Sequence, residues 1–419
     1  MTDPAGRING RRHRVVPRKR SLGGGNTLRG PHSHATFTDM SRRPSRISSS
    51  PLPPLYAAWA DDLLHGPIPQ ETEATCSDCA MCSGPKDRGR EADFFRPDTK
   101  CCTYVPELPN FLVGRILSEE DPRMAAGKAT VEARIAAGIH VTPLGLGRSR
   151  VQSLLYVQGQ GAAFGRNRTL RCPHYLEKQG GLCGIWLHRN AICATWFCKH
   201  VRGAVGDRFW KTLLQLLGAV EGALTRWCVL KLGLNSDALA RLFPPNDPNR
   251  PAPLEPGEID GVVDAASYRA LWGNWWKRER EFYEKCARLV SGLSWAKVVS
   301  IAGPDVRLHA HLTREAYKAL MATEVPDRLV AAPLRVTPMG EQTGRIVTYR
   351  PYDPLAVSQT VLDLLPFFDG RPTKEVLRRI QKERGVRLGK GLVRKLADFE
   401  ILVSAASEPE SPEQRDGTP

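Results

Sequence analysis

Three cysteines, Cys76, Cys79 and Cys82, follow one another at intervals of three residues in the stretch TCSDCAMC. Two residues between a pair of cysteines allow the backbone to fold back, so that both sulfurs can face the same ion. Such turns are typical of structural zinc sites and of iron–sulfur clusters, because both bind thiolates. We therefore expect this stretch to begin a metal site.

Six further cysteines follow along the chain. Cys101 and Cys102 are adjacent, and four more lie in the stretch RCPHYLEKQGGLCGIWLHRNAICATWFCKH. A single reduced cysteine is most often a buried apolar residue, but nine of the eleven cysteines lie in one segment, which favours metal binding. The predicted metal ligands are Cys76, Cys79, Cys82, Cys101, Cys102, Cys172, Cys183, Cys193 and Cys198.

The sequence leaves two metal centres open, zinc and an iron–sulfur cluster, since all-sulfur ligation suits either. His174, His188 and His200 lie among the cysteines, and each one taken alone is more typical of a core residue than of a ligand. A ligand set that is almost pure cysteine, although histidines are available, favours the iron–sulfur cluster over zinc.

The cysteine pattern resembles the YkgJ family, described as a zinc- or iron-chelating domain with a CxxCxxCC cluster. CSDCAMC and the later CC pair resemble its first part, and CPHY with CGIWLHRNAIC resembles its second part, over about residues 72–202. The sequence departs from the family in the insertion at 83–100, and in Asn190 and Trp186 where the family has proline and tyrosine. The resemblance implies metal binding. The matched positions are Cys76, Cys79, Cys101 or Cys102, Cys172, Cys183 and Cys193.

The charge of the chain is concentrated at its N-terminus. The net charge is +16, and residues 1–50 alone hold eleven Lys or Arg against two Asp or Glu. The basic composition is therefore weak evidence that the rest of the chain binds nucleic acid. The tail is interpreted as a nucleic-acid arm, as a targeting segment, or as a solvated or misassigned stretch without function if translation starts at Met40.

Hydropathy argues against export and against a membrane span. No apolar secretory segment follows the basic residues, and no run of 18 apolar residues occurs. We therefore predict a cytoplasmic protein that does not contact a membrane. Thiols stay reduced in that compartment, so clustered cysteines point to metal rather than to disulfides.

The predicted fold class is α+β, mostly helical. Apolar residues at helical spacing predict a long buried helix over 207–234 and another helix over 267–292. The predicted segments are a disordered basic tail and linker (1–70), a cysteine-rich metal-binding domain (71–205), a helical region (206–330), a small winged-helix domain (331–405) and a disordered acidic tail (406–419).

The last of these domains resembles the PqqD-like family over about residues 334–404. A strand hairpin, three helical stretches and a final strand are expected there, the first helix over 356–368. The Asp369-Gly370 turn and Thr373 match the family pattern. Modules of that family bind leader peptides by adding a strand to a sheet edge, so the resemblance implies a peptide or protein partner.

Two other interpretations of this domain remain open. In one, it is a DNA-binding winged helix whose Lys390, Arg394 and Lys395 approach phosphates, a partner that we do not favour. In the other, its charges form an ordinary solvated helix face without a partner.

The sequence contains no phosphate loop, nucleophile elbow or HExxH motif, and therefore leaves open whether the protein is an enzyme. We predict a metal-binding cysteine-cluster protein. One alternative is a peptide- or protein-modifying enzyme with the C-terminal domain docking its substrate, since one branch of the YkgJ family includes a lysine N-methylase. The other alternative is a DNA-binding regulator with a metal-sensing domain.

Overall fold

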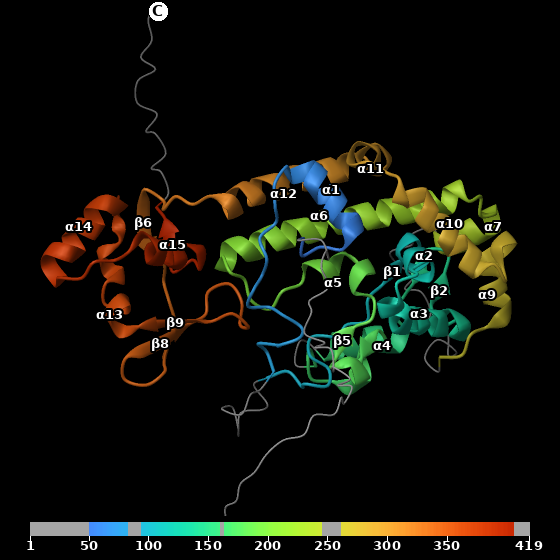
Figure 1. The fold of residues 1–419 in the computed structure, drawn as a ribbon, viewed down its shortest axis with the longest axis horizontal. Coiled ribbons are helices and arrows are strands. Elements are labelled where there is room, and N and C mark those ends of the chain that lie inside the picture. The colour runs from blue at the N-terminus through green and yellow to red at the C-terminus, as the bar shows by residue number, and fades with distance from the viewer. Residues whose placement is uncertain (1–49, 83–93, 160–162, 245–260, 406–419) are drawn as a thin grey trace, which may run out of the picture. The chain divides into compact units, whose positions relative to one another are not determined.

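The computed structural model of the protein describes residues 50–82, 94–159, 163–244 and 261–405. The chain is mostly helical with small antiparallel sheets, as the fold-class prediction had it (Figure 1). The predictions of disordered tails over 1–49 and 406–419 lie outside the described residues.

The long helix α6 runs through the middle of the described part before residue 322, with α12 on one side of it and α5 on the other (Figure 1). The bounds of the described helices in this part are α1 Pro54–Leu64, α2 Asn110–Leu117, α3 Ala125–Ala137, α4 Arg150–Gln158, α5 Ala191–Thr195, α6 Gly203–Lys231, α7 Ser236–Leu242, α9 Ala265–Trp272, α10 Glu279–Ser291, α11 Trp295–Ala302 and α12 Pro304–Met321.

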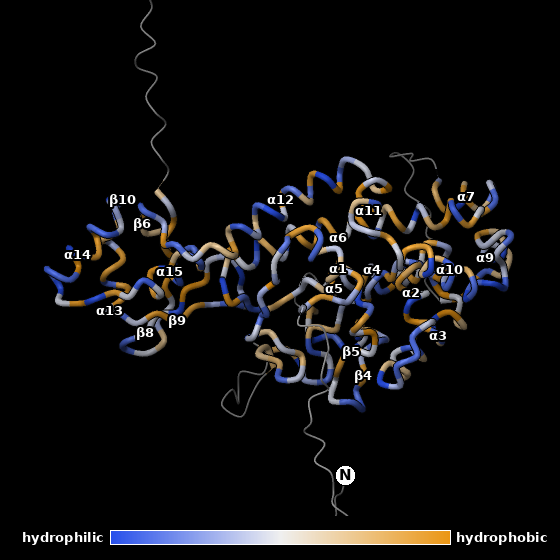
Figure 2. The backbone as a smooth tube through the Cα atoms, turned by 45° about the horizontal axis from the view of Figure 1, so that its top comes forward, coloured by the Kyte–Doolittle hydropathy of each residue, from blue (hydrophilic) through white to orange (hydrophobic). Residues whose placement is uncertain are grey.

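Helix α6 is the centre of a large apolar cluster. Its residues Phe209, Leu213 and Leu224 are wholly buried, and helices α5, α11 and α12 pack against it. Each such side chain contributes roughly 1.5–3 kcal/mol by leaving water. Figure 2 shows hydrophobic and hydrophilic stretches alternating along α12, as expected for a helix with one face on a core. The predicted long buried helix is confirmed.

By length and composition, α6 is also the one helix among the described residues that is apolar enough to cross a bilayer. Half of its most apolar window is buried inside the protein. A buried core helix meets the same criterion, so this is weak evidence for a membrane span.

Helix α1 lies where the sequence predicted a disordered linker. Tyr56 and Trp59 are 0% and 2% exposed, and both belong to the same apolar cluster as α6. The prediction was wrong for residues 54–64, because the prolines at 51, 53 and 54 start a helix rather than exclude one. Proline is favoured in the first turn, where its missing N–H costs nothing.

The single helix predicted over 267–292 is two helices, α9 and α10. Gly273, with φ of +50°, ends α9, and a short 3₁₀ turn connects it to α10. Trp272 and Trp275 on either side of this break are buried, so packing of the two indoles outweighs continuity of the helix.

The cysteine segment, residues 71–205, has little regular structure around its cysteines. A three-stranded sheet joins β1 (Leu108–Pro109), β3 (Gly145–Leu146) and β2 (Val141–Thr142), and a two-stranded sheet joins β4 (Tyr175–Leu176) to β5 (Leu182–Cys183). Residues from both sides of position 205 contribute to one apolar cluster.

The C-terminal module, residues 328–405, has an apolar cluster of its own, which includes Leu329, Ile380 and Val393. One sheet has the order β10-β6-β11 and the other β7-β8-β9, all antiparallel. The bounds are β6 Arg328–Ala331, β7 Val336–Pro338, β8 Thr343–Ile346, β9 Leu355–Ser358, α13 Gln359–Leu362, β10 Asp369–Pro372, α14 Thr373–Arg384, α15 Lys390–Asp398 and β11 Leu402–Ser404.

The expected hairpin is present as β7 and β8, but the helix expected over 356–368 is wrong in part. Strand β9 and the short helix α13 occupy its first half. The residues of β9 alternate in exposure, with Val357 buried between exposed neighbours, which is the pattern of an edge strand rather than of a helix.

Candidate metal centre

A cavity of about 280 Å³ lies inside the cysteine segment, and six of the nine predicted ligands line it. They are Cys76, Cys101, Cys102, Cys172, Cys183 and Cys193. A smaller cavity of about 50 Å³ adjoins it and adds Cys79 and Cys198. The sulfur of Cys82, the ninth, hydrogen-bonds that of Cys79. The structure thus brings residues up to 122 positions apart in the sequence to one place.

Backbone hydrogen bonds fix the first group of cysteines. The N–H of Cys82 donates to the carbonyl of Cys79 over 3.0 Å, which closes the turn expected of the CxxC spacing. The N–H of Phe95 then donates to the carbonyl of Met81, and so attaches the next segment to this turn. These two bonds hold the turn in place without support from a helix or a long strand.

The second group is attached directly to the first. The N–H of Cys172 donates to the carbonyl of Cys102 over 2.8 Å. Cys183 stands opposite Tyr175 in the β4–β5 pair, which holds it beside Cys172. Two short strands therefore fix the position of this second group of cysteines, as the tight turn fixes the first.

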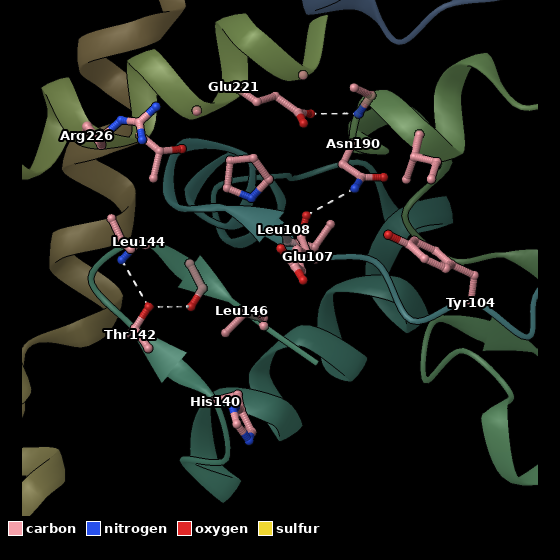
Figure 3. A pocket seen from close by; sticks show the side chains of 18 of the residues that line it. Tyr104, Glu107, Leu108, His140, Thr142, Leu144, Leu146, Asn190, Glu221 and Arg226 are labelled. Atoms are coloured by element: carbon pink, nitrogen blue, oxygen red, sulfur yellow. Dashed lines mark hydrogen bonds between the residues drawn. The ribbon is translucent and has the colours of Figure 1, made fainter. Parts of the chain in front are cut away.

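Cys193 is positioned by helix α5. The Asn190 side chain caps the helix by accepting from the Cys193 N–H over 3.2 Å, and Glu221 of α6 accepts from the Ala191 N–H over 2.7 Å (Figure 3). Asn190 also donates to the carbonyl of Glu107. Glu221 and Asn190 also line a separate pocket of about 540 Å³. Their hydrogen bonds to backbone groups give both residues a structural role in holding α5.

Burial holds five of the thiols in their protonated form. Burial raises the pKa of Cys76, Cys172, Cys183 and Cys193, and raises that of Cys198 to about 12. A metal ion that binds here must displace protons from these groups.

Two pairs of sulfurs are hydrogen-bonded to each other. The hydrogen bond from Cys82 lowers the pKa of Cys79 to about 6, while the pKa of Cys82 rises. The hydrogen bond with Cys102, together with burial, raises the pKa of Cys101. The Cys79–Cys82 pair therefore shares its proton, with Cys79 the more acidic of the two.

Lys100 is a buried cation beside the cysteines. It is 9% exposed, and its ammonium donates to the carbonyls of Cys76, Gly180 and Gly181 over 2.6, 3.1 and 3.1 Å. These bonds connect the first cysteine group to the turn before Cys183.

Arg189 is a second buried cation, 7% exposed. Its guanidinium lies 3.5 Å from the centre of the Trp186 ring and donates to the carbonyl of Cys193. Among the described residues, neither Arg189 nor Lys100 forms an ion pair with a carboxylate. Burying an uncompensated charge costs several kcal/mol, so the site as built is short of negative charge.

Aromatic rings form the remaining wall of the larger cavity. Phe164 contacts Trp196 edge-on at 5.4 Å between ring centres, and Phe95 at 5.3 Å. Tyr352 of the C-terminal module contacts Phe95 at 5.6 Å and lines the same cavity. An apolar wall of this kind limits the access of water to a metal and its ligands.

The three histidines of the segment are engaged elsewhere. His174 receives a hydrogen bond from Arg134 and contacts Thr130, and burial lowers its pKa to about 3. His188 contacts Glu119 over 2.8 Å. The ring Nδ1 of His200 lies 3.3 Å from the Tyr349 hydroxyl, its Nε2 has no partner among the described residues, and burial lowers the pKa of the ring to about 4. These contacts agree with the interpretation of the histidines as core residues.

Among the described residues, no three Cys, His, Asp or Glu side chains lie close enough together to hold a single metal ion. Zinc–sulfur bonds of about 2.3 Å in a tetrahedron require sulfurs about 3.8 Å apart. The sulfurs instead surround a cavity. The cavity of about 280 Å³ leaves room among these side chains for a group larger than a single ion.

Comparison with known proteins finds no family model, no curated protein and no solved structure that matches this chain. The resemblances to the YkgJ and PqqD-like families therefore stay predictions that rest on the motifs quoted above.

Sequence reasoning missed Lys100, Arg189 and Tyr352 at the site. Lys100 and Arg189 each lie within four residues of a predicted ligand, but so do other basic residues, and nothing local marks these two as buried. Tyr352 comes from 154 residues beyond the last predicted ligand, and no pattern in the sequence connects the two.

Proposed function

We propose that the protein binds an iron–sulfur cluster through the cysteines of residues 76–198. The observation that carries the proposal is a thiol-lined cavity flanked by two buried cations without carboxylate partners. Four thiolates around a dipositive centre leave a net negative charge, which would compensate Lys100 and Arg189. We place the protein in a reducing compartment such as the cytoplasm, where the thiols remain free for metal.

An almost pure cysteine ligand set around a cavity favours an iron–sulfur cluster over zinc. Four thiolates bind the four irons of a 4Fe–4S cluster or the two irons of a 2Fe–2S cluster, so they enclose a central volume. Zinc would require four of them to converge on one point. The residues that would hold the group are those lining the larger cavity, and the aromatic wall would shield it from water.

The C-terminal module is proposed to be a winged-helix domain. Its helices α14 and α15 and its hairpin of β7 and β8 support this assignment. Of the three basic residues considered for phosphate contacts, Arg394 is bound to Asp398 over 2.9 Å and to backbone carbonyls of 322 and 324. That engagement leaves Arg394 unavailable for phosphate, which weakens the DNA-binding alternative.

Metal and sulfide analysis of the full chain, purified without oxygen, tests the metal proposal. We expect iron with matching acid-labile sulfide and a broad visible absorption band. A colourless protein with one or two zinc ions per chain would instead make the cysteines a structural zinc site. A protein without either metal would overturn the proposal.

A pair of matched variants controls for general damage by cysteine replacement. Cys183→Ala with Cys193→Ala removes two cavity thiols and is expected to abolish metal binding. Cys228→Ala with Cys286→Ala removes two wholly buried thiols of the apolar core, where the Cys228 sulfur lies 3.9 Å from the Cys286 carbonyl. The second variant is expected to keep its metal. Equal loss in both variants would show that metal content follows stability and not ligation.

A further inference from the structure

The loop of residues 349–353 joins the C-terminal module to the thiol cavity. We propose that this loop is the lid of the cavity and that it fixes the position of Cys198, so that access to the thiols depends on how the module is seated. The role of the lid rests on the proposed metal site, but the contacts of the loop and the experiment that tests it do not require metal.

Tyr352 forms the covering part of the lid. It lines the larger cavity together with six cysteines, and its ring contacts Phe95 and Phe164 at 5.6 and 6.2 Å between ring centres. The other residues that line the cavity all precede position 200, and Tyr352 is the one contributed by the module. No hydrogen bond involves the Tyr352 hydroxyl among the described residues, so its ring carries this role.

Arg350 holds the lid to the backbone before Cys198. Its guanidinium donates to the carbonyl of Phe197 over 2.6 Å and pairs with Asp207 of α6 over 2.8 Å. It also lies 4.4 Å from the centre of the Trp196 ring. The side chains of Arg350 and Asp207 are 14% and 7% exposed, so the pair is shielded from solvent and stronger than a surface ion pair.

Asp353 holds the backbone after Cys198. Its buried carboxylate accepts from the N–H of His200 over 3.0 Å and from the hydroxyl of Tyr349, and it approaches Lys199 at 3.7 Å. The residues on both sides of Cys198 are therefore bound by the loop. Arg350 and Asp353 act as positioning residues for a cysteine that they do not touch.

A second attachment fixes the module as a whole. Asp398 of α15, which is 5% exposed, binds Arg202 at the start of α6 through both carboxylate oxygens. Gly203 has φ of +50°, and a Cβ there would meet the Phe399 ring at 2.6 Å and the Asp398 carbonyl at 2.8 Å. This close approach sets the seat of α15 on α6, and hence the place where the loop reaches the cavity.

The rate of thiol alkylation in the full chain without metal tests the lid. N-ethylmaleimide labelling at each cavity cysteine is followed by mass spectrometry in wild type, Arg350→Ala and Tyr352→Ala. We expect both variants to label Cys76, Cys101 and Cys102 at least about tenfold faster than wild type, because an open cavity admits the reagent. Two variants are used so that a folding defect in one does not decide the result.

Two controls separate a lid from a general loss of stability. Tyr352→Phe keeps the ring and is expected to label as wild type does. Arg387→Ala removes a matched arginine from an exposed site of the same module, between α14 and α15, and is also expected to leave labelling unchanged. Labelling of Cys228 and Cys286 in the apolar core reports global opening and should stay slow in every variant.

Equal labelling rates in wild type, Arg350→Ala and Tyr352→Ala would overturn the lid. That result is distinguishable from failure of the metal proposal, which is decided by the metal content of wild type alone. Where wild type does bind metal, the same variants should release it to a chelator faster than Arg387→Ala does.

Discussion

The cysteine segment and the C-terminal module differ in how they are held together. The module, with 78 residues, has its own apolar cluster of fourteen buried residues. In the cysteine segment, the described residues of 71–107 and 147–184 contribute no member to either cluster of buried residues. Their order rests on hydrogen bonds, on two buried cations, on thiols around a cavity and on scattered buried side chains such as Phe95 and Leu170. One region is built around an apolar core, and the other around a cavity lined by thiols.

This difference predicts which region depends on the proposed metal. Where binding energy replaces a hydrophobic core, metal binding and folding are the same event. The module should be indifferent to metal, since its apolar side chains already leave water without it.

The largest expected effect follows removal of metal. Chelation should greatly increase hydrogen exchange in residues 72–82, 94–104 and 168–190, because the net negative charge that balances Lys100 and Arg189 is lost. Amides of α14 and of β6 should keep their protection. Hydrogen–deuterium exchange with mass spectrometry checks this, and equal protection with and without metal would remove the contrast between the regions.

The second prediction concerns a substitution in the core of the module, which should destabilise the module and leave the cysteine segment intact. Ile380 of α14 is wholly buried, so Ile380→Ala should lower the free energy of unfolding of the module by about 2–5 kcal/mol. Leu392→Ala on the exposed part of α15 is the control and should cost much less. Hydrogen exchange of amides in the module, measured over a series of denaturant concentrations, gives the free energy of unfolding of both variants. A loss of metal binding as large as that of the cysteine variants would show that the two regions fold as one unit.

A third test concerns the junction where α5 meets the apolar core. Burial raises the pKa of Glu221 to about 7. The folded protein then binds more protons than the unfolded chain between pH 4.5 and 7, so this group makes stability fall as pH rises through that range. The effect amounts to about 3 kcal/mol above pH 7.

Glu221→Gln should remove that contribution while keeping an acceptor for the Ala191 N–H. The difference in unfolding free energy between the variant and wild type should be near zero at pH 4.5 and should favour the variant at pH 7.5. Thermal unfolding at a series of pH values measures it. A difference independent of pH would mean that Glu221 does not titrate in this range.

The smallest expected effect concerns the charge of one side chain. Lys100→Met keeps a long unbranched side chain but removes the ammonium that connects Cys76 to the turn at 180–181. Loss of such a supporting contact should weaken metal binding about ten- to a hundredfold. Competition with a chelator measures the change. Lys178→Met, an exposed lysine of the same segment, should bind as wild type does, and equal weakening in both would argue against a specific role of Lys100.

Parts of the fold were predictable because they depend on local patterns. The period of apolar residues gave α6, and the polar turn between two β-rich runs gave β7 and β8. The helix α1 was missed because a proline-rich approach was taken as a linker, and the break at Gly273 was missed because the apolar period continues across it. In both cases a buried tryptophan, Trp59 in α1 and Trp272 at the end of α9, stabilises the observed structure where local sequence preference is ambiguous.

The candidate site shows the same division. CxxC spacing fixes how neighbouring sulfurs can face one ion, so the sequence by itself determined which nine thiols were candidates and that each histidine was the weaker candidate. Only the tertiary structure decided that eight of those thiols border two adjoining cavities, that Lys100 and Arg189 are buried beside them, and that Tyr352 lines the larger one. The physical reason is that charge balance and exclusion of water depend on which segments meet in space, and spacing along the chain constrains only neighbours.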